Sequence, residues 1–213
     1  LHPLQPLERP RPLRRTPFYA QEQALGACFF EARGWEVPRW YEANTPLLRQ
    51  YPVAERTGWH GQFWSPVAGA EHLATRQTAG LFDMSPLPKL EVAGSGAADW
   101  LDTLLTAKVP RKPGRVVYGL FLDENGGIRS DVTITRRTDG RYQIGANGLA
   151  DLAWLRHALP GDGSVTVRDI TGALACLGLW GPHAREIVTR VSEDDWSHAA
   201  FPYYTAREMS VGE

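Results

Sequence analysis

The sequence predicts an α+β fold, with antiparallel hairpins and helices packed on one side of them. Two runs of β-forming residues, Val116–Leu122 and Asp131–Thr135, are separated by Asn125-Gly126-Gly127, which suits a tight turn. In Gly94–Thr106, apolar residues recur every three or four positions, as in an amphipathic helix. The 213 residues, 43% of them hydrophobic, are enough to bury a sizeable core or two small ones.

The N-terminal part of the chain predicts a connector followed by a helix. Residues 1–15 are rich in proline and arginine and predict an extended segment, because proline lacks a backbone donor. Thr16–Arg33 begins with Thr-Pro, a helix-start pattern, and predicts a helix that ends near Gly34. The aromatic residues of Trp35–Tyr51 indicate core and interdomain packing, with a ligand cage as the alternative.

The remaining pattern alternates between helices and strands. The expected elements are a helix over Gly69–Ala79, a strand over Lys89–Val92, the helix Gly94–Thr106 with Ser95 as its cap, the hairpin, a strand over Arg141–Gly145, a helix over Leu149–Leu159, a strand over Val165–Ile170, a helix over Ala184–Val191 and a strand within Asp194–Val211.

The second arm of the hairpin carries an acidic residue on its polar face. Asp131 is expected to be the first residue of this strand, and period two places Val132 and Ile134 on one face and Asp131, Thr133 and Thr135 on the other. From the pattern alone, Asp131 fits an ordinary solvent-facing or turn-capping carboxylate as well as a pocket residue.

Composition excludes several classes of function. With 23 basic and 24 acidic residues the chain has no net field to attract nucleic acid or an anionic membrane. Cys28 and Cys176 lie in apolar contexts and predict buried thiols, and His60 and His72 lack metal-ligand spacing. No apolar run predicts a membrane span or a signal peptide, and no Gly-x-Gly-x-x-Gly fingerprint follows a strand. We therefore expect a cytoplasmic protein without a metal site.

The hairpin resembles a known family. Glu124 to Asp131 is similar to the Asn-Glu-x-Gly-Gly-Ile-x-x-Asp motif of the aminomethyltransferases, the T-protein of the glycine cleavage system. This resemblance implies a folate-binding aminomethyltransferase-type fold, of which the chain would hold the N-terminal part. It also implies that Asp131 lies beside the nitrogens of tetrahydrofolate and acts as the catalytic residue.

The same resemblance suggests four cofactor-binding residues. Tyr118 fits a half-buried sheet tyrosine or a pocket residue across from Asp131, and Asn147 fits a helix cap, a turn residue or a folate contact. Leu87, in Pro86-Leu87-Pro88 where the family commonly has His-Met-Gly, would lie against the pterin ring. Tyr204, or its neighbour Tyr203, would reach the ligand from the C-terminal segment.

A second block of motifs resembles the region that joins the flavin and folate domains of dimethylglycine oxidase and sarcosine dehydrogenase. The matching residues are Pro12 to Phe18, Gly34-Trp35-Glu36 and Trp64 to Arg76. The implied organisation is a connector and small central domain over residues 1–58 and a truncated folate-binding domain over 59–213. The chain would then be a piece of a longer polypeptide whose upstream domain binds FAD and is its partner.

The resemblance implies one-carbon transfer. Tetrahydrofolate would capture the iminium carbon from oxidised dimethylglycine or sarcosine, giving 5,10-methylenetetrahydrofolate, while a carboxylate stabilises the charge that develops on the attacking amine. Two alternatives remain: a non-catalytic scaffold of the iron-sulfur maturation type, and a stand-alone glycine cleavage aminomethyltransferase. The central module before Trp59 argues against the stand-alone enzyme.

Overall fold

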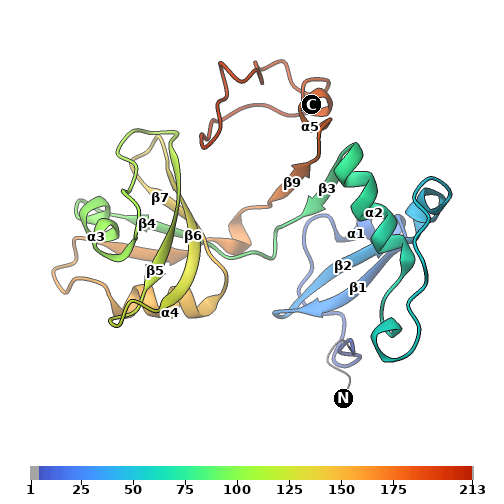
Figure 1. The fold of residues 1–213 in the computed structure, drawn as a ribbon. Coiled ribbons are helices and arrows are strands. Elements are labelled where there is room, and N and C mark those ends of the chain that lie inside the picture. Colours follow the sequence, from blue (N-terminus) through green and yellow to red (C-terminus); the bar gives the residue numbers. More distant parts are fainter. Residues whose placement is uncertain (1–4, 213) are drawn as a thin grey trace. The chain divides into compact units, whose positions relative to one another are not determined.

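The computed structural model describes residues 5–212, which form two compact units (Figure 1). The first unit comprises residues 5–86 and 175–187, and the second comprises residues 87–174 and 188–212. These units group residues by contact within the fold. The division into domains at residue 58 concerns the organisation of the parent protein and stays a prediction.

The first unit holds two small sheets and three α-helical segments. In chain order its elements are α1 (Tyr19–Ala24), β1 (Ala27–Ala32), β2 (Trp35–Tyr41), the 3-10 helices η1 (Glu42–Arg49) and η2 (Trp59–Gly61), α2 (Pro66–Gln77), β3 (Gly80–Asp83), β9 (Leu177–Trp180) and the start of α5 (Ala184–Val188). β1 pairs antiparallel with β2, and β3 pairs antiparallel with β9. A small core consists of Tyr51 and of Ala70 and Ala74, both from α2.

The helix predicted over Thr16–Arg33 is wrong in its second half. The helix α1 covers only Tyr19–Ala24, and Ala27–Ala32 is a strand. Between them Gly26 takes a φ of +70°, a left-handed conformation that ends a helix readily. The following Cys28-Phe29-Phe30 favours a strand, and it finds a partner in β2, which the amphipathic pattern alone could not reveal.

The second unit is built on one antiparallel sheet with the strand order β5-β6-β7-β4-β8. Its elements are β4 (Lys89–Ala93), α3 (Ala97–Leu104), β5 (Val116–Leu122), β6 (Ile128–Arg136), β7 (Tyr142–Gly145), α4 (Leu149–His157), β8 (Thr166–Asp169) and η3 (Thr171–Ala173). These confirm the expected strands and helices to within a few residues. Gly96 rather than Ser95 occupies the cap position of α3, and Asp194–Val211 forms no strand longer than a bridge between Thr205 and Arg115.

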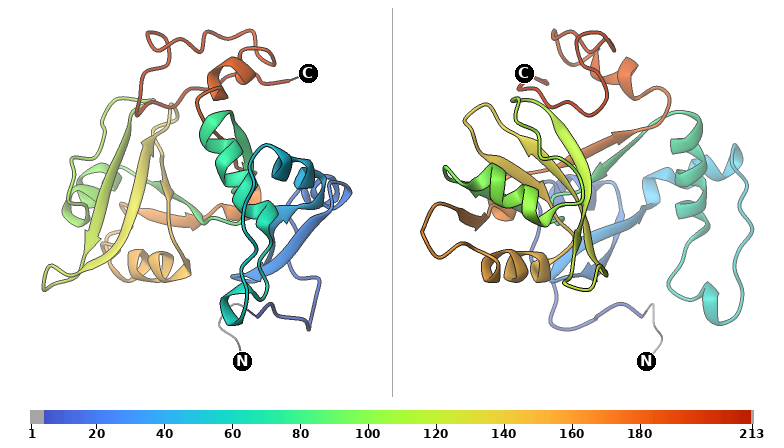
Figure 2. Two further views of the ribbon diagram at one scale, coloured as in Figure 1. Left: turned by 45° about the vertical axis from the view of Figure 1, so that its right-hand side comes forward. Right: turned by 60° about the vertical axis from the view of Figure 1, so that its left-hand side comes forward.

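Both helices of the second unit pack on one face of this sheet, as predicted (Figure 2). Cross-strand register places Leu90 opposite Ile144 and Ile144 opposite Ile134, and all three are fully buried. Leu101 of α3 and Leu155 of α4 are equally buried in the same cluster. Burying these side chains is the main stabilising contribution to this unit, because each removes a large apolar area from water.

The opposite face of the sheet is polar and carries the hairpin acid. Val132 and Ile134 are buried while Asp131 and Thr133 are exposed, so the predicted alternation is confirmed. The strand begins earlier than expected, however, and Asp131 is its fourth residue rather than its first. The tight turn uses Asp123, whose Oδ1 accepts N–H groups from Asn125 and Gly127, so the strand can start directly at Ile128.

Glu91 of β4 lies on the polar face and makes stability dependent on pH. Its buried carboxylate accepts hydrogen bonds from Arg168 and, at 3.0 Å, from Arg141 Nη1, and these bonds lower the pKa of Glu91. A lowered folded-state pKa contributes stability that is present above the unfolded pKa and lost as the pH falls. We expect Glu91→Gln to cost about 1–2 kcal/mol at pH 7 and progressively less as the pH falls from the usual glutamate range through the lowered pKa of the folded state. Urea unfolding across this range measures the difference, and a cost that does not change with pH would contradict the assignment.

Candidate functional site

The polar face of the hairpin brings three of the predicted residues together. Tyr118 of β5 and Asp131 of β6 are diagonal neighbours, since Tyr118 pairs with Thr133 in the sheet. The Tyr118 hydroxyl donates to Asp131 Oδ2 at 3.3 Å, a long hydrogen bond. The Asn147 amide donates to Asp131 Oδ1 at 2.9 Å and to its backbone carbonyl at 2.7 Å. The acid is therefore held in one orientation while its face remains exposed.

Tyr118 is close to half exposed, and its environment favours the neutral phenol. Partial desolvation and the adjacent Asp131 carboxylate raise the pKa of Tyr118. A neutral phenol keeps its proton and can donate it to a carboxylate or to an acceptor on a ligand.

Asn147 does not cap the helix that follows. Gly148 holds the cap position of α4, and Asn147 is not among the described residues with a positive φ. Its backbone N–H donates to Asp151 Oδ2 at 2.9 Å, and the Ser130 hydroxyl donates to the same oxygen at 3.1 Å. The buried Asp151 carboxylate thus fixes the loop, and the loop aims the Asn147 amide at Asp131.

Tyr204 lies beside the start of β5. The Val116 N–H donates to the Tyr204 carbonyl at 3.0 Å, and Val116 shares the polar face with Tyr118. The Tyr203 and Tyr204 rings form an edge contact with centroids 4.3 Å apart. A hydrogen bond to Tyr203, desolvation and the nearby phenols of Tyr203 and Tyr118 raise the pKa of Tyr204. Two exposed aromatic rings therefore border the face that carries Asp131.

Leu87 is placed further along the same sheet. It lies in the loop before β4, its side chain is 41% exposed, and its carbonyl accepts the Lys89 ammonium at 2.8 Å. In the sheet order β7 stands between β4 and β6, so Leu87 belongs to a different strand connection from the group around Asp131.

Sequence reasoning missed the residues that support this arrangement. Ser130 and Asp151 are buried and hold the Asn147 loop. Gly145 lies opposite both Thr133 and Lys89, and a Cβ there would stand 2.7 Å from Thr133 Oγ1. Because Gly145 has no side chain, no side chain projects from the polar face at this position. Asp151 could have been found from its position three residues after Gly148, where a helix N-terminus favours an acid.

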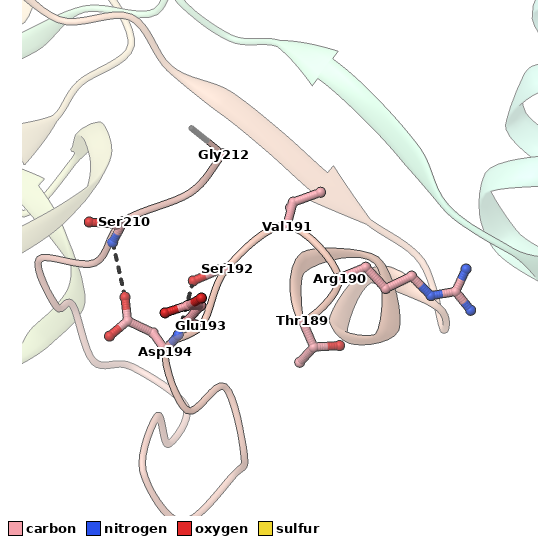
Figure 3. A pocket seen from close by; sticks show the side chains of 8 residues that line it. All are labelled: Thr189, Arg190, Val191, Ser192, Glu193, Asp194, Ser210 and Gly212. Atoms are coloured by element: carbon pink, nitrogen blue, oxygen red, sulfur yellow. Dashed lines mark hydrogen bonds between the residues drawn. The ribbon is translucent and has the colours of Figure 1, made fainter.

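A hollow in this unit carries none of the predicted residues. It has a volume of about 1070 Å³ and is formed by the C-terminal segment (Figure 3). It is lined by Thr189, Arg190, Val191, Ser192, Glu193, Asp194, Ser210 and Gly212. The side chains of Asp194 and Ser192 already accept hydrogen bonds from the C-terminal segment itself. Ser210 N–H donates to Asp194 Oδ2 at 2.9 Å, and Asp194 N–H donates to Ser192 Oγ at 3.3 Å.

Two kinds of feature are absent from residues 5–212. No group of three or more His, Cys, Asp or Glu side chains among them is arranged to hold a metal ion. None of their helices has the length and apolar character needed to span a membrane.

Comparison with known proteins relates the chain to a family. Residues 18–213 match the model of the GCVT N-terminal domain. The chain belongs to this family. The resemblance of the hairpin motif to aminomethyltransferases is thereby confirmed, as is the fold expected from it. The match to the crystal structure of glycine cleavage system aminomethyltransferase T from Bartonella henselae covers 84% of this chain, with a TM-score of 0.61 and 28% identity.

Two curated relatives are oxidising enzymes by name. The 4-methylaminobutanoate oxidase (formaldehyde-forming) of Paenarthrobacter nicotinovorans is 35% identical over 211 residues, which are 97% of this chain. The mitochondrial dimethylglycine dehydrogenase of Rattus norvegicus is 27% identical over 84% of this chain. The chain spans only 25% and 21% of the length of these two proteins, and 44% of the aminomethyltransferase structure.

Proposed function

We propose that the second unit binds tetrahydrofolate on its polar face and serves folate-dependent one-carbon transfer, with Asp131 as the catalytic residue. The observation that carries the proposal is the exposed Asp131 carboxylate, oriented by Asn147 and Tyr118, in a member of the GCVT N-terminal domain family. Tyr118, Asn147, Leu87 and Tyr204 are the proposed folate-binding residues. Membership of the family supports an enzyme relationship, and activity of this chain is part of the proposal.

The proposed chemistry follows from the position of the acid. Tetrahydrofolate attacks an iminium carbon through a neutral amine, which becomes cationic as the new C–N bond forms and must then lose a proton. A carboxylate within hydrogen-bond reach stabilises that charge and accepts the proton. Asp131 is suited to this task because both of its oxygens are placed by donors and its face is open.

The proposed parent is a flavin-dependent demethylating enzyme. The iminium would arise by FAD-dependent oxidation of dimethylglycine or sarcosine elsewhere in the polypeptide, and the product would be 5,10-methylenetetrahydrofolate. The relative named dimethylglycine dehydrogenase supports the substrate class, and the small fraction of its length that the chain matches supports a longer parent. A cytoplasmic location, predicted from the sequence, completes the proposal.

A second outcome is favoured by one relative. The oxidase that is 35% identical over nearly the whole chain is named as formaldehyde-forming. In addition, Pro86-Leu87-Pro88 stands where the family commonly has His-Met-Gly. If this domain has kept the fold but lost folate binding, water would hydrolyse the iminium made by the parent enzyme to formaldehyde and the demethylated amine, and the domain would act as a scaffold.

Calorimetric titration with 5-formyltetrahydrofolate tests the proposal. We expect saturable binding, weakened about tenfold by Tyr118→Phe, since a hydrogen bond in a polar site contributes on the order of 1 kcal/mol or more. Tyr51→Phe is a matched control, because its hydroxyl contacts Gln50 in the first unit. Absence of binding both in this chain and in the full-length protein that contains it would contradict folate binding and favour the second outcome.

A further inference from the structure

A chain of hydrogen bonds connects the buried interior of the second unit to the Asp131 carboxylate. It begins at Asp151 of α4 and passes through Ser130 of β6, both of which are buried. The Ser130 hydroxyl donates to Asp151 Oδ2 at 3.1 Å, and the Asn147 amide nitrogen donates to Ser130 Oγ, also at 3.1 Å. The same amide nitrogen donates to Asp131 Oδ1 at 2.9 Å. Two buried residues are therefore linked to the proposed catalytic acid through a single amide.

The direction of these bonds decides which end of the Asn147 amide faces the acid. A hydroxyl has one proton, and Ser130 gives it to the Asp151 carboxylate, so Ser130 Oγ can only accept from Asn147. An amide oxygen in this position would face three acceptor oxygens, namely Ser130 Oγ and the backbone carbonyl and Oδ1 of Asp131. The buried pair thus keeps the nitrogen end of the amide turned toward Asp131.

Asp151 is itself fixed by the backbone around it. Its Oδ2 accepts the N–H groups of Asn147 at 2.9 Å and of Gly148 at 3.3 Å, besides the Ser130 hydroxyl. It lies in the first turn of α4, where the helix dipole favours an acidic residue. Asp151 therefore determines both the path of the loop that carries Asn147 and the direction of the Ser130 hydroxyl.

The two oxygens of Asp131 consequently have different surroundings. Oδ1 accepts the Asn147 amide at 2.9 Å, a bond of ordinary length that the buried pair supports. Within residues 5–212, Oδ2 accepts only the Tyr118 hydroxyl, at 3.3 Å. Bonds between a hydroxyl and an oxygen are usually about 2.7–2.8 Å long, and Tyr118 is close to half exposed, so this bond is weak. A ligand N–H can replace it at Oδ2 more easily than it can replace the amide at Oδ1.

We propose that Ser130 and Asp151 are positioning residues, which hold Asp131 Oδ1 on the Asn147 amide and leave Oδ2 as the oxygen that accepts the proton. This inference rests on the proposed function. In the step, the N–H bond of the cationic folate nitrogen breaks, its electron pair stays on the nitrogen, and a new O–H bond forms at Oδ2. The amide bond to Oδ1 stops the carboxylate from rotating, so a lone pair of Oδ2 stays directed at the ligand.

Two variants of the full-length protein that contains this chain separate the roles of the two oxygens. Ser130→Ala releases the Asn147 amide; it should lower kcat for 5,10-methylenetetrahydrofolate about tenfold and change 5-formyltetrahydrofolate binding by less than about threefold. Tyr118→Phe removes the donor to Oδ2 and should do the converse, with binding weakened about tenfold and kcat changed by less than about threefold. Equal losses of kcat in both variants, or the opposite pattern, would overturn the assignment of the oxygens.

A graded pair at Asp151 and a matched control test the positioning role. Asp151→Asn keeps an oxygen that can accept the Ser130 hydroxyl and should retain kcat to within about threefold, whereas Asp151→Ala should lower it about tenfold. Thr16→Val removes a buried side-chain hydroxyl from the first unit and should leave kcat unchanged. If Asp151→Ala does not fold, Ser130→Ala carries the test. Equal kcat in Ser130→Ala and Thr16→Val would overturn the positioning role.

Hydrogen exchange at the Asn147 side-chain amide tests the arrangement without folate. Nuclear magnetic resonance of this chain follows the two Nδ2 protons, which are identified by their absence from Asn147→Ser. Ser130→Ala should speed their exchange with water about tenfold, because one acceptor is lost. Unchanged exchange would overturn the positioning role and leave the proposed function standing. Faster exchange, combined with an undiminished folate product in Asp131→Asn, would contradict the proposed function and with it the role of Oδ2.

Discussion

Asp131→Asn is expected to lower the yield of 5,10-methylenetetrahydrofolate about 100-fold or more, the usual cost of removing a general base, in the full-length protein that contains this chain. Asparagine keeps the size of the side chain and an oxygen that can accept the Asn147 amide, which lies 2.9 Å from Asp131 Oδ1. The fold and the oxidation of the amine should therefore be unchanged. Formation of the folate product is measured beside consumption of the amine.

The control for this variant lies in the same hairpin. Glu124 is exposed in the turn, and Glu124→Gln removes a carboxylate without touching the polar face of the sheet. It should leave the folate product unchanged. Equal yields from Asp131→Asn and the parent enzyme would remove Asp131 from the catalytic role.

Phe121→Ala is expected to destabilise the second unit by about 3–5 kcal/mol, because it leaves a large cavity in a packed core. Phe121 is fully buried on the inner face of β5, and its ring lies 5.1 Å from that of Trp154 in α4. Urea unfolding followed by far-ultraviolet circular dichroism measures the loss. This contact packs β5 of the hairpin against α4, and β5 also carries Tyr118. The variant should therefore also weaken ligand binding at the site around Asp131.

Ile128→Ala is the matched control for the core variant. Ile128 lies in the same hairpin, but its side chain is 69% exposed. Its truncation should change stability by no more than about 0.5 kcal/mol, as surface substitutions usually do. A similar loss in both variants would show that hairpin propensity, rather than core packing, stabilises this unit.

The elements of the second unit were predictable because their local patterns agree with their tertiary surroundings. The apolar positions of β6 alternate at Val132 and Ile134, and these are the residues that the structure buries. In α4, Leu152 and Leu155 recur at the helical spacing and form part of the same core. Where propensity, periodicity and burial favour the same state, a sequence suffices to locate an element.

The strand Ala27–Ala32 could not be predicted in the same way. Ala27, Cys28 and Phe29 continue the helical spacing of Ala24 and Leu25, and pairing with Trp35–Tyr41 selects the extended state. In the site, motif resemblance identified Asp131, Tyr118 and Asn147, which the structure brings into contact. The buried bond between Ser130 and Asp151 joins residues 21 positions apart, and no local pattern encodes such a pairing.

The outer edge of β5 has a consequence for the behaviour of the protein in solution. Near its start, Val116 N–H donates to the Tyr204 carbonyl, and near its end the Leu120 carbonyl accepts the Thr106 N–H at 3.0 Å. An edge strand with free backbone groups is a template for strand addition by another molecule, which leads to aggregation. Because its own loops occupy both ends of β5, the chain leaves little length of that edge on which a second copy could nucleate a continuous intermolecular sheet.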